Sequence, residues 1–160
     1  TTETNKYLTF KLGEENYGLV IDKVLEIISM QKITPVPRTP DYIRGVVNLR
    51  GVIHPVIDLN QKFGMGSTEE TDLTCIIVVT IKRDHKQEQL GVIVDAVTEV
   101  EDIKIENIED TPSLGNNINT QFIKGMAKTE GKVTMLLALQ KALSNKDLDV
   151  ISKVNQEKND

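Results

Sequence analysis

The sequence predicts an all-β protein made of two small β-barrel lobes that share a core, followed by a short C-terminal helix. Three observations carry this prediction. Apolar and polar residues alternate along short segments bounded by Gly, Pro, Asn and Asp; one pattern of such segments occurs twice; and helical periodicity is confined to the residues after Ser144. A chain of 160 residues is long enough for one domain of this kind.

The internal repeat relates the two halves of the chain. Gly18–Glu26 returns 73 residues later as Gly91–Glu99, and Ile43–Leu59 returns 80 residues later as Ile123–Leu139. Each copy contains about five short strands, which is typical of a small barrel. Because a barrel of about 60 residues is marginally stable alone, the two lobes are expected to share an apolar seam. The prediction is one domain over residues 1–160, with copies at about 7–63 and about 73–143.

The first strands and the linker follow from local patterns. Tyr7–Leu12 alternates as a half-buried strand, Gly13–Asn16 is a turn, and Tyr17–Ile21 returns as a second strand. Thr34–Pro40 contains three prolines, which exclude both a helix and a central strand, so this segment is an extended linker.

A hairpin follows the linker. Its arms, Val46–Val47 and Val52–Leu59, are rich in β-branched residues, and Gly51 at the tip tolerates positive φ. Asn60–Phe63 then suggests one helical turn. The tip also carries Arg50, and a guanidinium in an apolar hairpin is expected to have a partner, within the chain or outside it.

The C-terminal helix is predicted at about residues 145–155. Ser144 and Asp147 have the spacing of a capping box, with Asp in place of the usual Glu or Gln. Leu148, Ile151 and Val154 then recur every third residue, as on one face of an amphipathic helix.

Composition excludes several classes of function. A net charge of −5 and an aromatic content of 4% argue against nucleic-acid binding, which uses basic faces and stacking rings. The chain has no apolar run of membrane-spanning length and no signal-peptide core, so we predict a cytoplasmic protein without membrane insertion.

The residues predict no catalytic site, metal site or cofactor, and therefore no enzyme. His54 and His85 are far apart in the sequence and Cys75 is alone, so no pair has the spacing of a zinc site. Cys75 is expected to be a small buried hydrophobe and His54 a satisfied structural histidine. Asp22 and its repeat counterpart Asp95 are expected to accept hydrogen bonds in turns.

One difference between the two copies points to function. Arg50 in the first copy is Glu130 in the second, which inverts the charge at the hairpin tip. Two interpretations stay open: drift on a solvated turn, or a guanidinium that binds a partner or pairs with an acid such as Glu26. Val24 and Ile27 make the preceding segment unusually apolar, although core packing also explains Val24.

Two stretches resemble a known family. The segment Ile43–Leu59, with its Asn48-Leu49-Arg50-Gly51 tip, and the segment Tyr17–Ile27 resemble CheW, the bacterial chemotaxis coupling protein family, and the match runs from about Tyr7 to Leu143. The resemblance implies two five-stranded SH3-like barrels and an adaptor without enzymatic activity. A small-barrel peptide-binding module outside chemotaxis is the alternative.

The resemblance also implies partners and contact residues. They are the regulatory domain of the histidine kinase CheA and the cytoplasmic hairpin tip of chemoreceptors (methyl-accepting chemotaxis proteins), in arrays at the membrane. The positions expected to contact the receptor are Val24, Glu26, Ile27, Arg50, Gly51 and Val100. The positions expected to contact the kinase are Cys75, Ile76, Ser113 and Leu114, with a thinner resemblance at Ser113 and Leu114.

Overall fold

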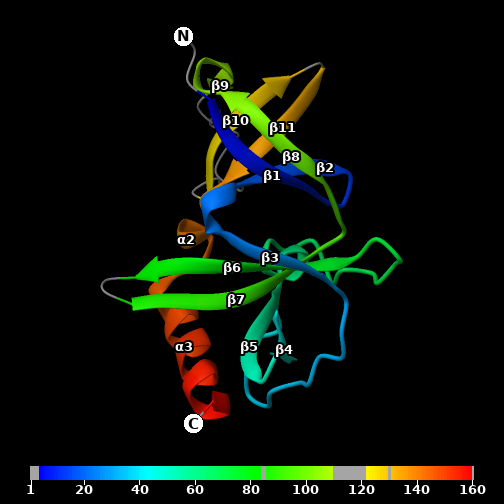
Figure 1. The fold of residues 1–160 in the computed structure, drawn as a ribbon. Coiled ribbons are helices and arrows are strands. Elements are labelled where there is room, and N and C mark those ends of the chain that lie inside the picture. Colours follow the sequence, from blue (N-terminus) through cyan, green and yellow to red (C-terminus); the bar gives the residue numbers. More distant parts are fainter. Residues whose placement is uncertain (1–3, 84–85, 110–121, 130, 160) are drawn as a thin grey trace.

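A computed structural model of the chain describes residues 4–83, 86–109, 122–129 and 131–159 as two β-sheet lobes, one above the other, with a helix along the lower lobe (Figure 1). The strands are β1 (Thr4–Leu12), β2 (Glu15–Val20), β3 (Val24–Ser29), β4 (Ile43–Leu49), β5 (Val52–Asp58), β6 (Cys75–Arg83), β7 (Lys86–Val94), β8 (Ala96–Lys104), β9 (Ile108–Glu109), β10 (Ile123–Thr129) and β11 (Lys132–Leu137). The helices are α1 (Leu59–Lys62), α2 (Leu139–Ala142) and α3 (Asn145–Asn159), with single 3₁₀ turns at Ile21–Lys23 and Ile105–Asn107.

Each lobe takes strands from both halves of the chain. The six-stranded sheet has the order β8-β1-β2-β11-β10-β9, and the five-stranded sheet has the order β3-β6-β7-β5-β4. By the repeat, the strands β1 to β5 of the first copy correspond in order to β6, β7, β8, β10 and β11 of the second. When each strand is replaced by its counterpart, the strand order of one sheet becomes that of the other, apart from β9. The two predicted lobes are confirmed, but neither lobe is built from a single copy.

The exchange joins the halves through parallel strand pairs. β2 runs parallel to β11, with Gly18 opposite Leu136, and β7 runs parallel to β5, with Gly91 opposite Val56. A Cβ atom added to Gly18 would lie 3.1 Å from the Leu136 side chain, and one added to Gly91 would lie 3.4 Å from the Val56 side chain. The repeated glycine therefore allows close packing where the halves meet.

The sixth strand has a shorter counterpart in the other lobe. β9 pairs with β10 through two residues, whereas in the five-stranded lobe the linker residue Thr34 makes a single bridge to Val46 of β4. The expectation of five strands in each lobe is therefore wrong by one strand, because the same edge contact is one residue longer in the second copy.

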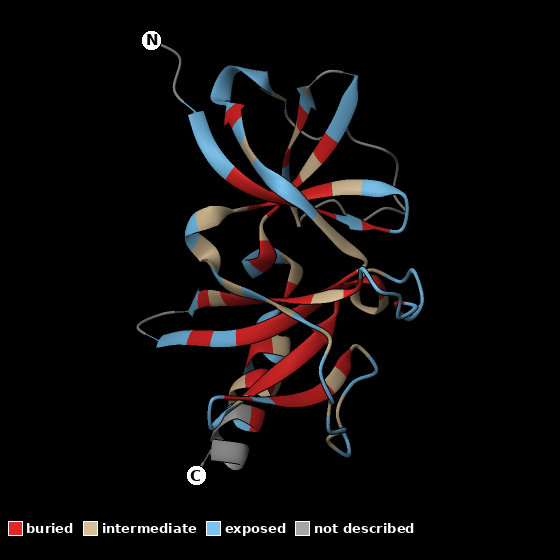
Figure 2. Ribbon diagram, turned by 45° about the vertical axis from the view of Figure 1, so that its right-hand side comes forward, coloured by how far each residue is buried: buried red, intermediate tan, exposed pale blue. Residues whose placement is uncertain are grey.

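Three apolar clusters account for the shared core. The largest lies at the seam and joins both sheets, with Phe10 and Leu19 from one sheet and Ile77 and Val92 from the other. Two smaller clusters fill the interiors of the lobes. β6 contributes to the seam and to a lobe interior on alternate residues, which explains its almost continuous apolar run. Figure 2 shows that burial is densest in the lower lobe, where α3 contacts β5 and β7.

The capping box at the start of α3 is confirmed. The Asp147 amide donates to Ser144 Oγ at 3.1 Å, and the Ser144 amide donates to Asp147 Oδ2 at 2.9 Å. Leu148, Ile151 and Val154 are all buried, as predicted. The helix continues to Asn159, four residues beyond the expected end.

Asp147 also ties α3 to the five-stranded lobe. Its carboxylate accepts hydrogen bonds from Lys62 Nζ at 2.7 Å and from the Tyr42 hydroxyl. Burial alone would raise the pKa of Asp147, but the bonds from Lys62, Tyr42 and Ser144 outweigh it and hold this pKa at about 2. The carboxylate is therefore charged across the physiological range and anchors the helix.

We expect Asp147→Asn to lower the free energy of unfolding by about 2 kcal/mol at pH 7, because a partly buried Lys62 loses its counter-charge. The folded pKa lies below the unfolded value of 3.8, so the carboxylate contributes its full stabilisation above about pH 4 and loses it as the pH falls towards 2. Urea unfolding at pH 7 and pH 2.5 measures both effects. Asp102→Asn, which breaks the exposed pair with Lys6, is the matched control and should change little. A deficit of equal size at both pH values would contradict this account.

Candidate protein-interaction surface

The tip of the β4–β5 hairpin is a two-residue turn of Arg50 and Gly51. Both residues have positive φ, 53° and 88°, as the tight turns that match strand twist require. The Gly51 amide donates to Asn48 Oδ1 at 2.9 Å, which closes the turn. Gly51 at the tip was predicted to tolerate positive φ, and it adopts it. The turn projects Arg50 outward, and 75% of its side chain is exposed.

Arg50 forms a two-pronged ion pair with Glu26 of β3. Nη1 donates to Glu26 Oε1 at 3.3 Å, and Nη2 donates to Oε2. The hydrogen bond from Arg50 lowers the pKa of Glu26, and the same bond raises the pKa of Arg50. β3 and β4 are the two edge strands of the five-stranded sheet, so the pair spans the opening between its edges. This is the pairing that the charge asymmetry at the tip indicated.

Exposed aliphatic side chains precede and follow Glu26 along β3. On β3, Leu25 and Ile27 flank Glu26 and are 49% and 45% exposed, and Val52 beside the turn is also exposed. The register of β3 against β6 shifts between Val24 and Glu26, and Leu25 is the additional residue at this bulge. After the bulge Ile27 lies opposite Ile77 and Glu26 opposite Val78, so their side chains lie on opposite faces of β3. An edge strand with exposed aliphatic residues and an exposed bidentate charge pair is a candidate protein-binding surface.

His54 was not predicted to belong to this surface. Its ring is only 8% exposed, and Nδ1 has no hydrogen-bond partner in the described part of the chain, so the expectation of a satisfied histidine is wrong at this nitrogen. Burial lowers the pKa of His54, while Glu26 raises it and Arg50 lowers it further. The position of His54 in the middle of an apolar strand was the only signal in the sequence.

Two predicted receptor positions, Val24 and Val100, do not lie at the Glu26–Arg50 ion pair. Val24 is partly buried against the seam cluster, which favours the core interpretation of this residue. Val100 is 51% exposed but belongs to β8 in the six-stranded lobe, where it lies opposite Leu8. By the repeat, Val100 is the counterpart of Ile27, so each lobe exposes an aliphatic residue at the same place on an edge strand. No described contact joins Val100 to Arg50.

The predicted kinase positions differ in how far their side chains are exposed. Cys75 starts β6 opposite Ser29 and is half-buried; burial raises the pKa of its thiol, and a backbone hydrogen bond involving Val97 opposes this. Ile76 is fully buried, so its side chain is not available at the surface. Ser113 and Leu114 lie outside the described residues.

Of the two acids singled out by the repeat, Asp95 has the predicted role. Asp95 Oδ2 accepts from the Gly13 amide at 2.5 Å and from Asn60 Nδ2 at 3.1 Å, which confirms it as a turn acceptor. Asp22 makes no such bond within the described segments. Over the same segments no group of three or more His, Cys, Asp or Glu is placed to hold a metal ion. No described helix is both long and apolar enough to cross a bilayer.

Comparison with known proteins gives one consistent match. The family model for the CheW-like domain matches residues 6–147. The chain is 33% identical over 153 residues to chemotaxis protein CheW of Klebsiella aerogenes, covering 96% of this chain and 90% of the relative. It is 31% identical over 132 residues to chemotaxis protein CheW of Bacillus subtilis, covering 82% of each. The crystal structure of scaffolding protein TtCheW from Thermoanaerobacter tengcongensis matches with a TM-score of 0.79 and 39% identity, over 91% of this chain and 96% of that one.

Proposed function

Because this chain belongs to the CheW family, we propose that it is a non-enzymatic adaptor that couples chemoreceptors to the histidine kinase CheA in chemotaxis arrays. The relatives' names and the scaffolding-protein structure support a chemotaxis adaptor. The observation that carries the proposal is the exposed Glu26–Arg50 pair, together with the exposed aliphatic residues Leu25 and Ile27 on the same edge strand as Glu26.

The receptor contact is assigned to this surface. The tip of a receptor hairpin is a pair of helices, and an exposed ridge of such a pair can pack its apolar residues against Leu25 and Ile27. Removing this aliphatic area from water supplies affinity at about 25 cal/mol per Å². Glu26 and Arg50 act at the rim, where a charge pair determines orientation and partner choice more than affinity.

Val100 is included as a second apolar contact. It occupies the place of Ile27 in the other lobe, and its exposure is similar. A receptor helix long enough to extend across both lobes would meet both residues. Gly51 serves by holding the turn, and Val24 by supporting β3 from within the core.

The kinase contact is assigned to a different place. Cys75 and Ile76 begin β6 beside the end of β3, and Ser113 and Leu114 complete the set that the resemblance implies. The burial of Ile76 limits its contribution to shaping this end of the sheet, while Cys75 presents part of its surface.

Two calorimetric titrations test the proposal. One uses the regulatory domain of CheA from the same cell, and the other uses a receptor fragment that carries the hairpin tip. We expect saturable one-to-one binding in both, and we expect each partner to bind when the other is already present, because the surfaces are separate. Absence of heat and of co-elution with the kinase domain at tens of micromolar would remove that partner, and absence of both interactions would favour a peptide-binding module outside chemotaxis.

A further inference from the structure

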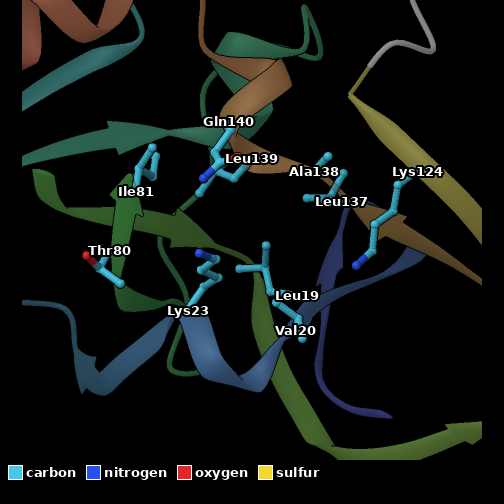
Figure 3. Close-up of a pocket in the computed structure, with 10 residues that line it drawn as sticks. All are labelled: Leu19, Val20, Lys23, Thr80, Ile81, Lys124, Leu137, Ala138, Leu139 and Gln140. Carbon is cyan, nitrogen blue, oxygen red and sulfur yellow. The ribbon is translucent and has the colours of Figure 1, made fainter. Parts of the chain in front are cut away.

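A cavity of about 200 Å³ lies at the seam between the two lobes, on the side of α2 (Figure 3). Its walls are mainly aliphatic and come from β2, β6, β11 and the start of α2. The two charged residues in the lining are Lys23 and Lys124, and none of the lining residues is acidic. Figure 3 shows the two lysines on opposite sides, with the side chains of Leu19, Leu137 and Ala138 between them.

The repeat shows what this cavity lacks. In the first copy, Arg44 Nη1 lies 3.1 Å from Asp58 Oδ2, and the Asp58 carboxylate is fully buried. Eighty residues later the counterparts are Lys124 and Ala138. The cation of the pair is kept in the second copy, but its carboxylate is replaced by a methyl group.

No ion pair within the described part of the chain neutralises the two lysine charges. Among the described residues neither Lys23 nor Lys124 forms an ion pair, and the Lys124 ammonium lies 5.0 Å from the centre of the Tyr7 ring. Lys23 also has an uncharged counterpart, Ala96, in the other copy. The cavity thus carries two uncompensated cations, whereas the equivalent Arg44 and Asp58 neutralise each other.

We propose that the cavity binds a small organic monocarboxylate. The carboxylate takes the place of the missing Asp58 counterpart and pairs with Lys124, and the apolar body lies between Leu19 and Leu137. A dry apolar cavity of about 150 Å³ holds benzene, so this larger cavity suits a body of about six to eight carbons. The site is separate from the Glu26–Arg50 surface, and the inference does not depend on the adaptor function.

The test uses octanoate and its uncharged analogue octanamide. Each is titrated into the full chain and followed by two-dimensional ¹H–¹⁵N NMR. We expect saturable shifts of amides in β2, β11 and α2, with octanoate binding about tenfold more tightly than octanamide because its charge pairs with an ammonium.

Three variants identify the site. Lys124→Gln should weaken octanoate binding about tenfold and leave octanamide binding unchanged. Ala138→Asp should abolish octanoate binding, because the new carboxylate occupies the position next to Lys124. Lys128→Gln is the matched control on the same strand, since Lys128 is exposed and already pairs with Glu109 at 3.1 Å, and it should bind octanoate normally.

Four outcomes would each overturn the proposal. Two concern affinity: equal binding of the two probes, or unchanged octanoate affinity in Lys124→Gln. The other two are amide shifts confined to another part of the molecule and no binding at millimolar octanoate. If Ala138→Asp does not fold, Lys124→Gln alone decides the outcome, because Lys124 is exposed and its replacement is compatible with the fold.

Discussion

Arg50→Glu is expected to weaken binding of the receptor hairpin about tenfold or more while the protein stays folded. The substitution places a second carboxylate against Glu26, so two like charges replace a bidentate pair at the rim of the proposed surface. The fold should tolerate the change because the Arg50 side chain is largely exposed. Titration calorimetry measures the binding, and circular dichroism with a thermal melt measures the fold.

Two further variants show whether the receptor contacts the individual charges of Glu26 and Arg50 or depends on the ion pair between them. Lys128→Glu reverses an exposed charge near the end of β10, the counterpart of β4 in the other lobe, and it should leave receptor binding intact. The double variant Glu26→Arg with Arg50→Glu restores an internal ion pair with inverted positions. If receptor binding stays weak in the double variant, the receptor contacts the individual charged side chains. If binding recovers, the ion pair acts by holding β3 and the hairpin together. A melted Arg50→Glu protein would make Arg50 a structural residue instead.

Gly45→Ala is expected to reduce the free energy of unfolding by about 4 kcal/mol, the largest stability effect that we predict for a single methyl group. Gly45 has a φ of 143°, and a Cβ atom added there would lie 2.1 Å from the carbonyl oxygen of Thr34. That oxygen accepts the Val46 amide at 2.9 Å, and the Thr34 amide donates to the Val46 carbonyl at the same distance. The methyl group therefore forces the linker away from β4 and breaks both bonds. Urea unfolding gives the measurement.

Substitutions at two other glycines separate backbone strain from steric contact as causes of this loss of stability. Gly64 has a φ of 77° with no atom within 4 Å of an added Cβ, so Gly64→Ala reports the backbone strain alone, about 1 kcal/mol. Gly125, the repeat counterpart of Gly45, would place a Cβ 2.7 Å from the Ile108 side chain, so Gly125→Ala reports mainly the steric contact. A Gly45→Ala cost no greater than that of Gly64→Ala would show that the linker moves freely.

Much of the fold could be predicted from local patterns. The turn at Gly51 and the capping box at Ser144 each depend on neighbouring residues, and the structure has both. The alternation at Tyr7–Leu12 correctly predicts a strand, but Tyr7 and Thr9 are buried as well, so the expectation of a half-buried strand is wrong. Strand partners could not be predicted in the same way. The repeat shows that β2 and β7 are equivalent. It does not show whether the strand that pairs with each of them comes from the same half of the chain or from the other half.

The site was predictable where opposite charges lie on short, well-patterned segments. Glu26 and Arg50 are such a case, and they meet as expected. Burial was harder to predict for Ile76, because β6 is covered on both faces and its apolar run gives no indication of which residues face a partner. The cavity beside Lys124 arises where β2, β6 and the β11–α2 segment, which are far apart in the sequence, pack together, and only the Asp58-to-Ala138 difference indicates it.

The exchange of strands between the halves has a consequence for how such a molecule can be assembled. A single copy holds two strands of one sheet and three strands of the other, so by itself it leaves edges unpaired in both. Two separate copies would complete each other as a symmetric homodimer, each lending its first two strands to the partner's sheet. Joining the copies in one polypeptide makes that association intramolecular, so the two-lobed architecture no longer depends on protein concentration. It also leaves each copy free to diverge, and the chain has diverged at both places that matter here: the Arg50 turn and the Lys124 cavity.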